Sequence, residues 1–566
     1  MTKSYPLLLP NEPIFHRLIE NSRLVTGTIV HDPTCHVDAG YRQLLQDVLA
    51  LRQCLYKKLP ASAFDAKGVI VEDEPYIFIL SPGNYEFIVA VFAVLACGGA
   101  VVPLAPGVLP AEAHYFANEC RSSVILASSR CWEQSQKISQ HLEAQGHPMT
   151  VVPISPAKRS PFSPVADFRI EVDESLLIAQ SRPSLILYTS GTTGPPKAVV
   201  QLRPYFAHGY GTSPSDVFLT HRPPHWIGGL RSIIGLVLSG TKQEVIEPHE
   251  EVIWERLRKG GVTIMCCLIP LWCKLMKHYK EVLSYLTEAE LQGYLKGIRG
   301  VRMARVGGAA PMPSLLRFWR ETIGIHLEVS YGSTETGGPG MTTNASCDRN
   351  LEGSVGMPDS GVLVKLSKGD HGEILIKSSY LFAGYLGDER QTRAAFTPDG
   401  FYKTGDYGRR VRGQYIIEGR AAADFVRFHA YRVPILEVES KLLELPFVSE
   451  ACIVSVPDER SAARVAAIVR FHQDFPGGNL HNIREALSDK LSQYKLPTAL
   501  RVLQEGEEIP TTLTGKVMRR LVVERFFQLK DNYELPSEVE LLDIQSQKQV
   551  GGNAKAWDWA GLQVDS

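Results

Sequence analysis

Residues 188 to 197 form a loop whose composition suits phosphate binding. Its members are Tyr188, Thr189, Ser190, Gly191, Thr192, Thr193, Gly194, Pro195, Pro196 and Lys197. Glycines let backbone N–H groups approach a phosphate closely, hydroxyl groups add donors, and a lysine adds a cation. The loop is not a Walker A motif, because Gly194 is followed by two prolines where that motif requires Lys-Ser or Lys-Thr. A hydroxyl-rich turn after a buried strand is the alternative, and we favour the phosphate loop.

Shorter motifs with polar or small residues follow downstream. They are Gly307-Gly308-Ala309-Ala310-Pro311, Tyr331-Gly332-Ser333-Thr334-Glu335, Phe401-Tyr402-Lys403-Thr404-Gly405-Asp406, Gly419-Arg420 and Pro510-Thr511-Thr512-Leu513-Thr514-Gly515-Lys516. The small residues at 307–311 either let a flat base lie against the backbone or make a tight strand-to-helix turn. Asp406 at a loop tip can accept hydrogen bonds from both ribose hydroxyls. Glu335 and Lys516 would be unremarkable loop residues if each were met alone.

In order and spacing, these motifs resemble those of the adenylate-forming, AMP-binding superfamily of acyl-CoA synthetases, adenylation domains and luciferases. The resemblance covers about residues 76–523. It implies that ATP and Mg²⁺ bind here. The implied nucleotide-binding residues are Thr189, Ser190, Gly191, Thr192, Thr193, Gly194, Lys197, Gly308, Ala309, Ala310, Tyr331, Gly332, Asp406 and Arg420.

The resemblance also implies individual roles. Tyr331 would stack on adenine, Thr334 would hold the α-phosphate, and Glu335 would bind Mg²⁺, a metal that takes hard oxygen ligands along with phosphates. Lys516 would be the catalytic lysine, a cation that touches the carboxylate and the α-phosphate while charge develops between them. A rotation of the smaller domain about a hinge at Asp424 would serve the two half-reactions.

The acyl-binding region is expected around His225, which the family places as a gate beside the pocket. The other predicted pocket residues are Trp226, Gly229, Arg305, Ser330 and Gly337. A satisfied core histidine is the alternative for His225. Amino-acid adenylation domains carry an aspartate shortly after this point, and residues 226–242 contain none, so we expect an acid without an α-amine. Strand alternation directs Arg305 either toward a second polar group of the acid or into a salt bridge with a neighbour.

Within the family, the chain looks most like malonyl-CoA synthetases. Those enzymes carry an arginine immediately before the Tyr-Gly motif, where this chain has Ser330, so malonate is not the expected substrate. The hinge loop also lacks the usual glycine, because Ala430 follows His429 there. The added bulk would hinder the pantetheine arm of coenzyme A.

Length and patterning predict the frame that positions these residues. A chain of 566 residues is longer than a single hydrophobic core usually supports, so at least two domains are expected. Short apolar β-branched runs that alternate with helical patterns indicate an α/β fold. Predicted strands include 76–80, 123–127, 150–154 and 185–188. We expect a large multi-sheet N-terminal adenylation domain at 1–423, a smaller mobile α+β domain at 424–528, and a weakly ordered tail at 529–566.

Composition limits the partners and the compartment. A net charge of -1 provides no basic face for nucleic acid, and the uncharged stretch 87–104 is interrupted by glycines, which predicts a buried helix and strand and no membrane span. The ten scattered cysteines favour reduced thiols. Residues 1–10 lack the features of a signal peptide, and the last three residues are not the peroxisomal signal Ser-Lys-Leu, so we expect a cytoplasmic protein.

Together these features predict an ATP-dependent ligase that activates a small carboxylic acid as an acyl adenylate and transfers it to coenzyme A, in a biosynthetic pathway for secondary metabolites. One alternative is a stand-alone adenylating enzyme that loads a carrier-protein phosphopantetheine, with that carrier or a downstream acyltransferase or synthase as its partner. A nucleotide-binding relative without catalysis is the other alternative. Lys197, Glu335, Asp406, Arg420 and Lys516 are all present and argue against it.

Overall fold

The computed structural model describes most of the chain. The residues outside the description are 1–7, 72–74, 157–169, 190–195, 208–210, 312, 350, 421–424, 429–430, 459–460, 474, 476, 492, 513–515, 529–534 and 543–566, together with the side chains of Arg420, Arg427, Tyr431, Arg432 and Ala462. The centre of the predicted phosphate loop, the predicted hinge residue Asp424 and the pair at 429–430 therefore lie outside the described residues.

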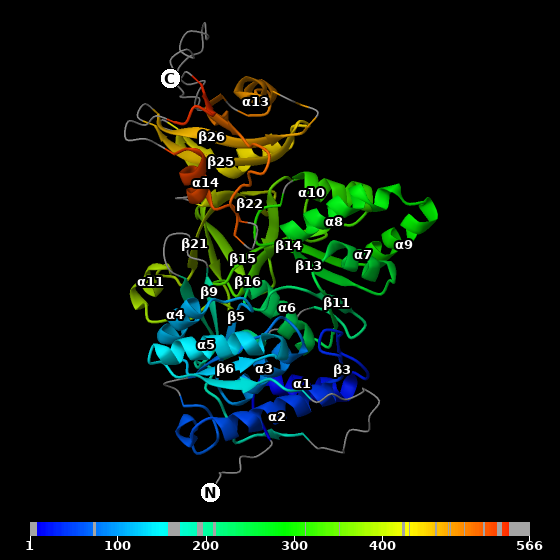
Figure 1. The fold of residues 1–566 in the computed structure, drawn as a ribbon, viewed down its shortest axis with the longest axis vertical. Coiled ribbons are helices and arrows are strands. Elements are labelled where there is room, and N and C mark those ends of the chain that lie inside the picture. The colour runs from blue at the N-terminus through cyan, green and yellow to red at the C-terminus, as the bar shows by residue number, and fades with distance from the viewer. Residues whose placement is uncertain are drawn as a thin grey trace.

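A seven-stranded sheet forms the lower part of the molecule in Figure 1. Its strands, in spatial order, are β20 (Gly384–Tyr385), β10 (Lys197–Leu202), β9 (Pro183–Thr189), β5 (Ala100–Leu104), β4 (Tyr76–Leu80), β6 (Val124–Ala127) and β7 (Thr150–Pro153). Strands β9 to β7 run parallel, whereas β10 is antiparallel to β9 and to β20. The central strands are apolar on both sides because helices cover both faces of the sheet.

The helices on this sheet are amphipathic or wholly buried. They are α1 (Pro13–Leu24), α2 (Tyr41–Lys58), α3 (Tyr85–Ala96), α4 (Pro110–Cys120) and α5 (Trp132–Ala144). Side chains of α2 and α3 pack on one face, and side chains of α4 and α5 pack on the other. Every residue of α3 is buried, as the uncharged stretch predicted. Among the described residues, no helix combines the length and apolarity that a membrane crossing requires.

A thirteen-stranded sheet occupies the middle of the molecule. Its strands, in spatial order, are β18 (Leu363–Lys368), β19 (His371–Lys377), β21 (Tyr402–Val411), β22 (Gln414–Arg420), β17 (Ser354–Pro358), β16 (Gly338–Thr342), β15 (Leu327–Ser333), β14 (Met303–Gly307), β13 (Ile264–Leu268), β11 (Val217–Thr220), β12 (Lys242–Val245), β2 (Val30–Asp32) and β3 (Val37–Ala39). The strands from β2 to β15 are parallel, and the ribbons from β16 to β18 are antiparallel.

Helices cover the two faces of the parallel part unequally. They are α6 (Ile227–Leu238), α7 (Glu250–Arg258), α8 (Ile269–Glu281), α9 (Glu288–Arg299) and α10 (Pro313–Arg317), while α11 (Glu389–Ala394) lies beside β20. Leu236 of α6 packs with Cys266 and Met303 on one face. The opposite face meets α7 to α10 around the buried rings of Trp254 and Trp272.

A smaller domain carries the C-terminal part of the described chain, coloured yellow to red in Figure 1. Its sheet contains β24 (Tyr431–Pro434), β23 (Phe425–Phe428), β26 (Ala462–Phe471), β27 (Ala499–Val502), β28 (Val539–Leu541) and, also paired with β26, β25 (Val448–Asp458). Helices α12 (Ile435–Leu443) and α13 (Leu480–Leu487) pack on one face, and α14 (Arg519–Phe526) packs on the other. The predicted fold class, a large multi-sheet α/β domain with a smaller α+β domain, is confirmed.

The structure differs from the sequence expectation in the C-terminal tail. Residues 539–541 were expected to be weakly ordered, but they form β28, which pairs with Leu500 and Arg501 of β27. The polar composition hid this strand, because its ordering comes from one buried apolar side chain, Val539, and from the edge of a sheet that is remote in sequence. A two-stranded pairing of β1 (Leu9–Pro10) with β8 (Val172–Asp173) completes the described sheets.

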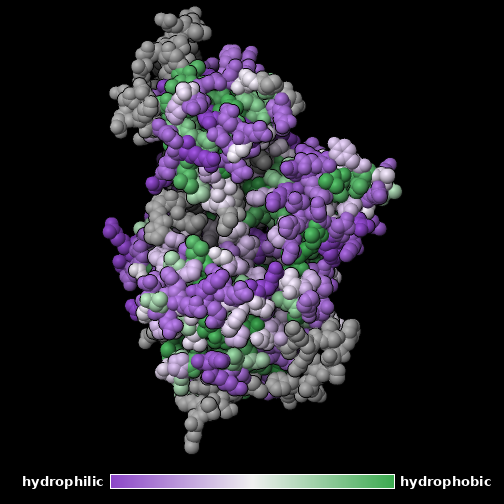
Figure 2. All heavy atoms as spheres, in the orientation of Figure 1, coloured by the Kyte–Doolittle hydropathy of each residue, from purple (hydrophilic) through white to green (hydrophobic). Residues whose placement is uncertain are grey.

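The face shown in Figure 2 is mainly hydrophilic, with hydrophobic residues in separate patches. The large apolar residues that are most exposed include Leu24, Leu177 and Tyr285, which belong to different parts of the chain. All ten cysteines are free thiols.

A buried ion pair ties the N-terminal helix to the strands that carry the phosphate loop. Arg203 directly follows β10, and its guanidinium binds both oxygens of the Glu12 carboxylate, with Nε donating to Oε1 at 2.8 Å. The two side chains are 1% and 4% exposed. The same guanidinium donates to the carbonyls of Leu95 and Gly99, at the end of α3, so all of its charge is matched inside the protein.

We predict that Arg203→Met lowers the free energy of unfolding by about 3–5 kcal/mol, because it leaves the Glu12 carboxylate buried without its cation. The matched control is Arg393→Met, since Arg393 pairs with Glu389 at 3.9 Å and both side chains are largely exposed. That variant is expected to lose less than about 1 kcal/mol. Urea titrations followed by tryptophan fluorescence measure both. Equal losses in the two variants would contradict this role of Arg203.

Candidate functional site

The predicted phosphate loop is the connection of a hairpin. Thr189 ends β9 and pairs directly with Lys197, the first residue of β10, and the Thr189 hydroxyl donates to the Lys197 carbonyl at 3.4 Å. The residues between them, including Ser190, Gly191, Thr192, Thr193 and Gly194, lie outside the described residues. The hairpin therefore places Lys197 at the base of the loop.

Tyr385 contacts both Lys197 and Glu335, the glutamate that is predicted to bind the metal. The Nζ of Lys197 lies 5.2 Å from the centre of the Tyr385 ring, and the Tyr385 hydroxyl donates to Glu335 Oε1 at 3.2 Å. Gln201, a buried side chain of β10, donates to the Thr334 carbonyl at 3.1 Å. Motifs that are more than 100 residues apart in the sequence thus meet at one place.

The turn between β15 and β16 requires its glycines. A Cβ on Gly332 would lie 2.0 Å from the Gly338 carbonyl oxygen, so any larger residue would separate the strands. Gly337 has a φ of +72°, and a Cβ on it would lie 2.3 Å from the Tyr380 carbonyl oxygen. This tight turn presents Thr334 and Glu335 at the carboxyl end of β15, the edge of a parallel sheet where ligands usually bind.

Asp406 lies beside Tyr331, as expected for residues that hold one nucleoside. The Tyr331 hydroxyl donates to Asp406 Oδ2 at 2.5 Å. Asp406 pairs across β21 and β22 with the backbone of Arg420, whose side chain lies outside the description. After β14, the adjacent strand, Gly308, Ala309 and Ala310 are exposed, which leaves their backbone open to a flat base.

The donor set around Glu335 suits Mg²⁺. Mg²⁺ usually takes one or two protein oxygens and completes its shell with phosphates and water. Glu335 supplies a carboxylate and Thr334 a hydroxyl, and no cluster of three or more metal-ligating side chains occurs among the described residues. A shared site, in which the nucleotide provides further ligands, is therefore the arrangement that these residues fit.

Lys516 belongs to a hairpin of the smaller domain. Its backbone N–H donates to the Thr512 hydroxyl at 3.2 Å, and its carbonyl accepts from the Thr512 N–H at 2.8 Å. Thr511 and Val517 pair next to them. The hairpin holds the lysine in a defined place on its domain, and its approach to the nucleotide stays a prediction.

The predicted acyl-binding residues gather where α6 begins. His225 and Trp226 immediately precede the helix, with their ring centres 5.4 Å apart. A Cβ on Gly229 would lie 1.9 Å from the Pro223 carbonyl oxygen, so glycine is required for this loop to fold against the helix. Burial lowers the pKa of His225 to about 4, which keeps the ring neutral at physiological pH. Its Nδ1 is buried and has no hydrogen-bond partner among the described residues.

Arg305 and Ser330 lie on the sheet face that α6 covers. Arg305 pairs in register with Glu328, and its Nε donates to Glu328 Oε2 at 2.8 Å. Of the two orientations expected for Arg305, the structure thus shows a salt bridge, formed with the neighbouring strand. Ser330 follows on the same face of β15, and its Oγ is buried without a partner in the described part of the chain.

Sequence reasoning missed Tyr385, and it did not predict the contacts that Arg231 makes. Tyr385 links Lys197 to Glu335, and Arg231 of α6 donates to the Gly337 carbonyl at 2.7 Å while its guanidinium lies 5.3 Å from the centre of the Tyr380 ring. A Gly-Tyr pair in a short strand gives no signal by itself. These contacts come from tertiary folding and not from local patterns.

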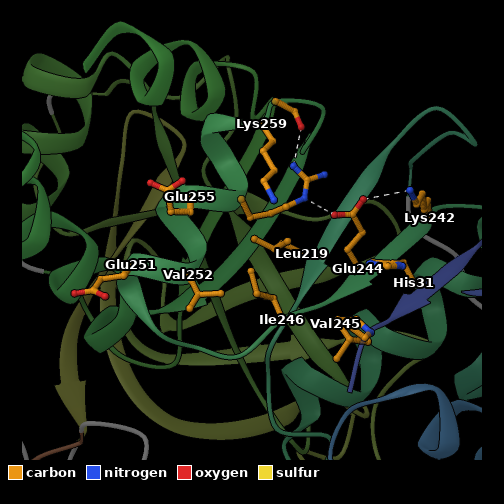
Figure 3. A pocket seen from close by; sticks show the side chains of 13 residues that line it. His31, Leu219, Lys242, Glu244, Val245, Ile246, Glu251, Val252, Glu255 and Lys259 are labelled. Atoms are coloured by element: carbon orange, nitrogen blue, oxygen red, sulfur yellow. Dashed lines mark hydrogen bonds and ion pairs between the residues drawn. The ribbon is translucent and has the colours of Figure 1, made fainter. Parts of the chain in front are cut away.

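A separate hollow of about 800 Å³ lies at the other end of the same sheet, between α7 and the strands β11, β12 and β2 (Figure 3). Its most central charges neutralise each other, since Glu244 accepts from Arg256 at 2.6 Å and lies 3.2 Å from Lys242. No predicted site residue lines it. These paired charges are not the convergent, unpaired polar groups that characterise ligand sites.

Two protein-family models match most of this chain. The family model described as AMP-binding enzyme matches residues 52–386, and the model described as AMP-binding enzyme C-terminal domain matches residues 437–516. The chain is 34% identical over 552 residues to the acyl-CoA ligase oryP of Aspergillus oryzae, covering 95% of this chain and 97% of that protein. It is 28% identical over 533 residues to the mitochondrial malonate–CoA ligase ACSF3 of Bos taurus, covering 86% and 85%.

Solved structures agree with the fold. ATP-bound MatB from Rhodopseudomonas palustris superposes with a TM-score of 0.75 at 21% identity, covering 92% of this chain and 99% of that chain. The o-succinylbenzoate CoA synthetase MenE from Bacillus subtilis, in complex with its acyl-adenylate, gives a TM-score of 0.71 at 21% identity, covering 89% and 97%. The predicted resemblance and enzyme class are confirmed: the chain belongs to the AMP-binding enzyme family and is an acid–thiol ligase of the acyl-CoA synthetase type.

Proposed function

We propose that this enzyme uses Mg·ATP to activate a carboxylic acid as an acyl adenylate and then transfers the acyl group to coenzyme A. The observation that carries the proposal is the junction of Lys197, Tyr385 and Glu335 beside the Tyr331–Asp406 hydrogen bond. A cation, a carboxylate and a nucleoside-binding pair meet there, where triphosphate, metal and adenosine would need them.

The first step replaces one bond to phosphorus by another. A carboxylate oxygen of the acid attacks the α-phosphorus of ATP, the bond to the β-phosphate oxygen breaks, and pyrophosphate leaves with its electrons. Lys197 and the loop that follows Thr189 would hold the departing phosphates, and Thr334 the α-phosphate. Mg²⁺ at Glu335 would neutralise phosphate charge. Lys516 would stabilise the charge that develops between the carboxylate and the α-phosphate.

The second step exchanges the adenylate for a thioester. The thiolate of coenzyme A attacks the acyl carbon, and AMP leaves with one oxygen that came from the acid. In the proposal, the domain hinge lies at Asp424, with the mobile domain at 424–528. His225, neutral and half-buried, would border the acyl chain with Trp226, Gly229 and Gly337.

The choice of acceptor rests on the relatives. The relatives at 34% and 28% identity are named as CoA ligases, which favours free coenzyme A over a carrier protein. Incubation with ATP and a panel of carboxylic acids, with either coenzyme A or a phosphopantetheinylated carrier protein, tests this directly. Acyl-CoA as the dominant product supports the proposal, and turnover with the carrier alone would contradict it.

A biosynthetic role in secondary metabolism and a cytoplasmic location complete the proposal. One relative, the malonate–CoA ligase ACSF3 of Bos taurus, is named mitochondrial, which makes the compartment a point for direct measurement. Fluorescence microscopy of the tagged full-length chain would settle the compartment, and metabolite profiling after gene deletion would test the pathway. Loss of a primary metabolite on deletion would contradict the biosynthetic assignment.

We predict that Lys516→Ala lowers adenylate formation by about 100–1,000-fold, the usual loss for one group that acts on developing charge. ATP binding should change little, because other residues hold the nucleotide. Pyrophosphate exchange measures the first quantity and calorimetry with ATP the second. Lys490→Ala, an exposed lysine of the same domain, is the control and should keep full exchange. Wild-type exchange in Lys516→Ala would refute the assigned role.

We predict that Asp406→Ala raises the KM for ATP by about tenfold or more, since the variant loses an acceptor for ribose and also the partner of the Tyr331 hydroxyl. The KM for the acid should change much less. Asp370→Ala is the matched control, because Asp370 is exposed and pairs with Arg410 on the surface. A selective rise in the KM for the acid would contradict the nucleoside role of Asp406.

A further inference from the structure

Charged side chains are concentrated on the sheet face beneath α6, a region that would be apolar in a pocket for a plain fatty acid. We call it the polar face and define it by Arg222, Arg231, Arg305, Glu328 and Asp359. Arg305 and Glu328 are neighbours on β14 and β15, and Arg222 precedes α6. The buried thiol of Cys266, on β13, lies within electrostatic reach of Arg222, Arg305 and Glu328.

Most of these charges have partners within the polar face. Arg305 binds Glu328 at 2.8 Å, and Arg231 binds the Gly337 carbonyl at 2.7 Å. Asp359 accepts from the Thr342 hydroxyl at 3.2 Å and lies within electrostatic reach of Arg231 and Arg305. Three guanidinium groups against two carboxylates leave a positive excess.

Arg222 is the cation that remains unmatched. Its Nε is buried without a hydrogen-bond partner, and its guanidinium forms no hydrogen bond or ion pair with any described residue. The group is held close to the helix, since a Cβ on Gly228 would lie 2.3 Å from its Nη2. A buried donor without an acceptor is costly, so a ligand that accepts a hydrogen bond from Arg222 would gain stability there.

Two more buried polar atoms lack partners among the described residues. They are Nδ1 of His225, three residues after Arg222, and Oγ of Ser330, which lies on β15 on the sheet face that α6 covers. Both residues were predicted to line the acyl pocket. An acid with hydrogen-bonding groups could pair with such atoms, whereas an alkyl chain would leave them unpaired.

We infer that the acid activated by this enzyme carries a second oxygen-bearing group, by preference an anionic one, that accepts hydrogen bonds from Arg222. The inference rests on the proposed function and specifies its substrate class. Arg222 lies on a different element from the arginine that precedes the Tyr-Gly motif in malonyl-CoA synthetases, a position that is Ser330 here. Its guanidinium presents several donors in a fixed plane, which suits a carboxylate or a ketone oxygen.

Matched acids test the inference in the wild-type enzyme. Each plain alkanoic acid is compared, by pyrophosphate exchange, with an acid of equal length that carries a distal carboxylate and with one that carries a distal ketone. The better of the two oxygen-bearing acids should have a kcat/KM about tenfold or more above that of the plain acid. Comparing the carboxylate with the ketone shows whether the enzyme prefers a charged or a neutral group. If the plain acid has a kcat/KM equal to or above those of both oxygen-bearing acids at every length, the inference is wrong while the proposed function stands. Failure of every acid to support exchange would refute the proposed function, and the inference with it.

Variants identify the residue responsible. Arg222→Met should lower the ratio of kcat/KM for the oxygen-bearing acid over the plain acid by about tenfold or more, and Arg222→Lys should restore part of it, because it keeps the charge but not the planar donors. Arg410→Met, which changes an exposed arginine, should leave the ratio unchanged. The thermal midpoint and the KM for ATP verify that each variant is folded. An unchanged ratio in folded Arg222→Met would overturn the inference, and if that variant does not fold, an unchanged ratio in Arg222→Lys would do so.

Discussion

Two hydrogen bonds between the two large sheets hold the predicted nucleotide site together. Gln201 of β10 donates to the Thr334 carbonyl, and Tyr385 of β20 donates to Glu335. Both donors belong to the seven-stranded sheet and both acceptors follow β15 of the thirteen-stranded sheet. The phosphate-loop lysine and the predicted metal ligand can act on one nucleotide only if the sheets meet here. The buried Arg203–Glu12 pair supports this junction, because it fixes the far end of β10.

The same junction explains the glycines around it. Gly332 lets β15 and β16 approach so closely that a Cβ there would collide with the Gly338 carbonyl, and a Cβ on Gly338 would collide with the Arg231 side chain. On one side of this turn, Tyr331 reaches Asp406, and on the other, Arg231 reaches Gly337. The predicted nucleotide side and the predicted acyl side therefore share one short segment, as the proposed formation of the adenylate requires.

Local patterns in the sequence predicted much of this frame. The strand Tyr76–Leu80 was placed at its observed bounds, because an apolar β-branched run bounded by polar residues is distinctive. The Tyr-Gly turn and the Gly-Asp motif were found through spacing and family resemblance. Tyr385 and Arg222 could not be found in this way, since their significance lies in contacts with residues about 50 positions away or more, or in the lack of such contacts. The pairing of Arg305 with Glu328 likewise depends on the register between β14 and β15. The sequences of the two strands, read separately, do not specify that register.

The central claim is that the carboxylate of the acid attacks the α-phosphorus of ATP before any thioester forms. The most direct test supplies the acid with ¹⁸O in its carboxylate, together with Mg·ATP and coenzyme A, and locates the label by mass spectrometry. The account predicts that AMP carries one labelled oxygen for each acyl-CoA formed, and that pyrophosphate carries none. Unlabelled AMP, or label in phosphate or pyrophosphate, would contradict it.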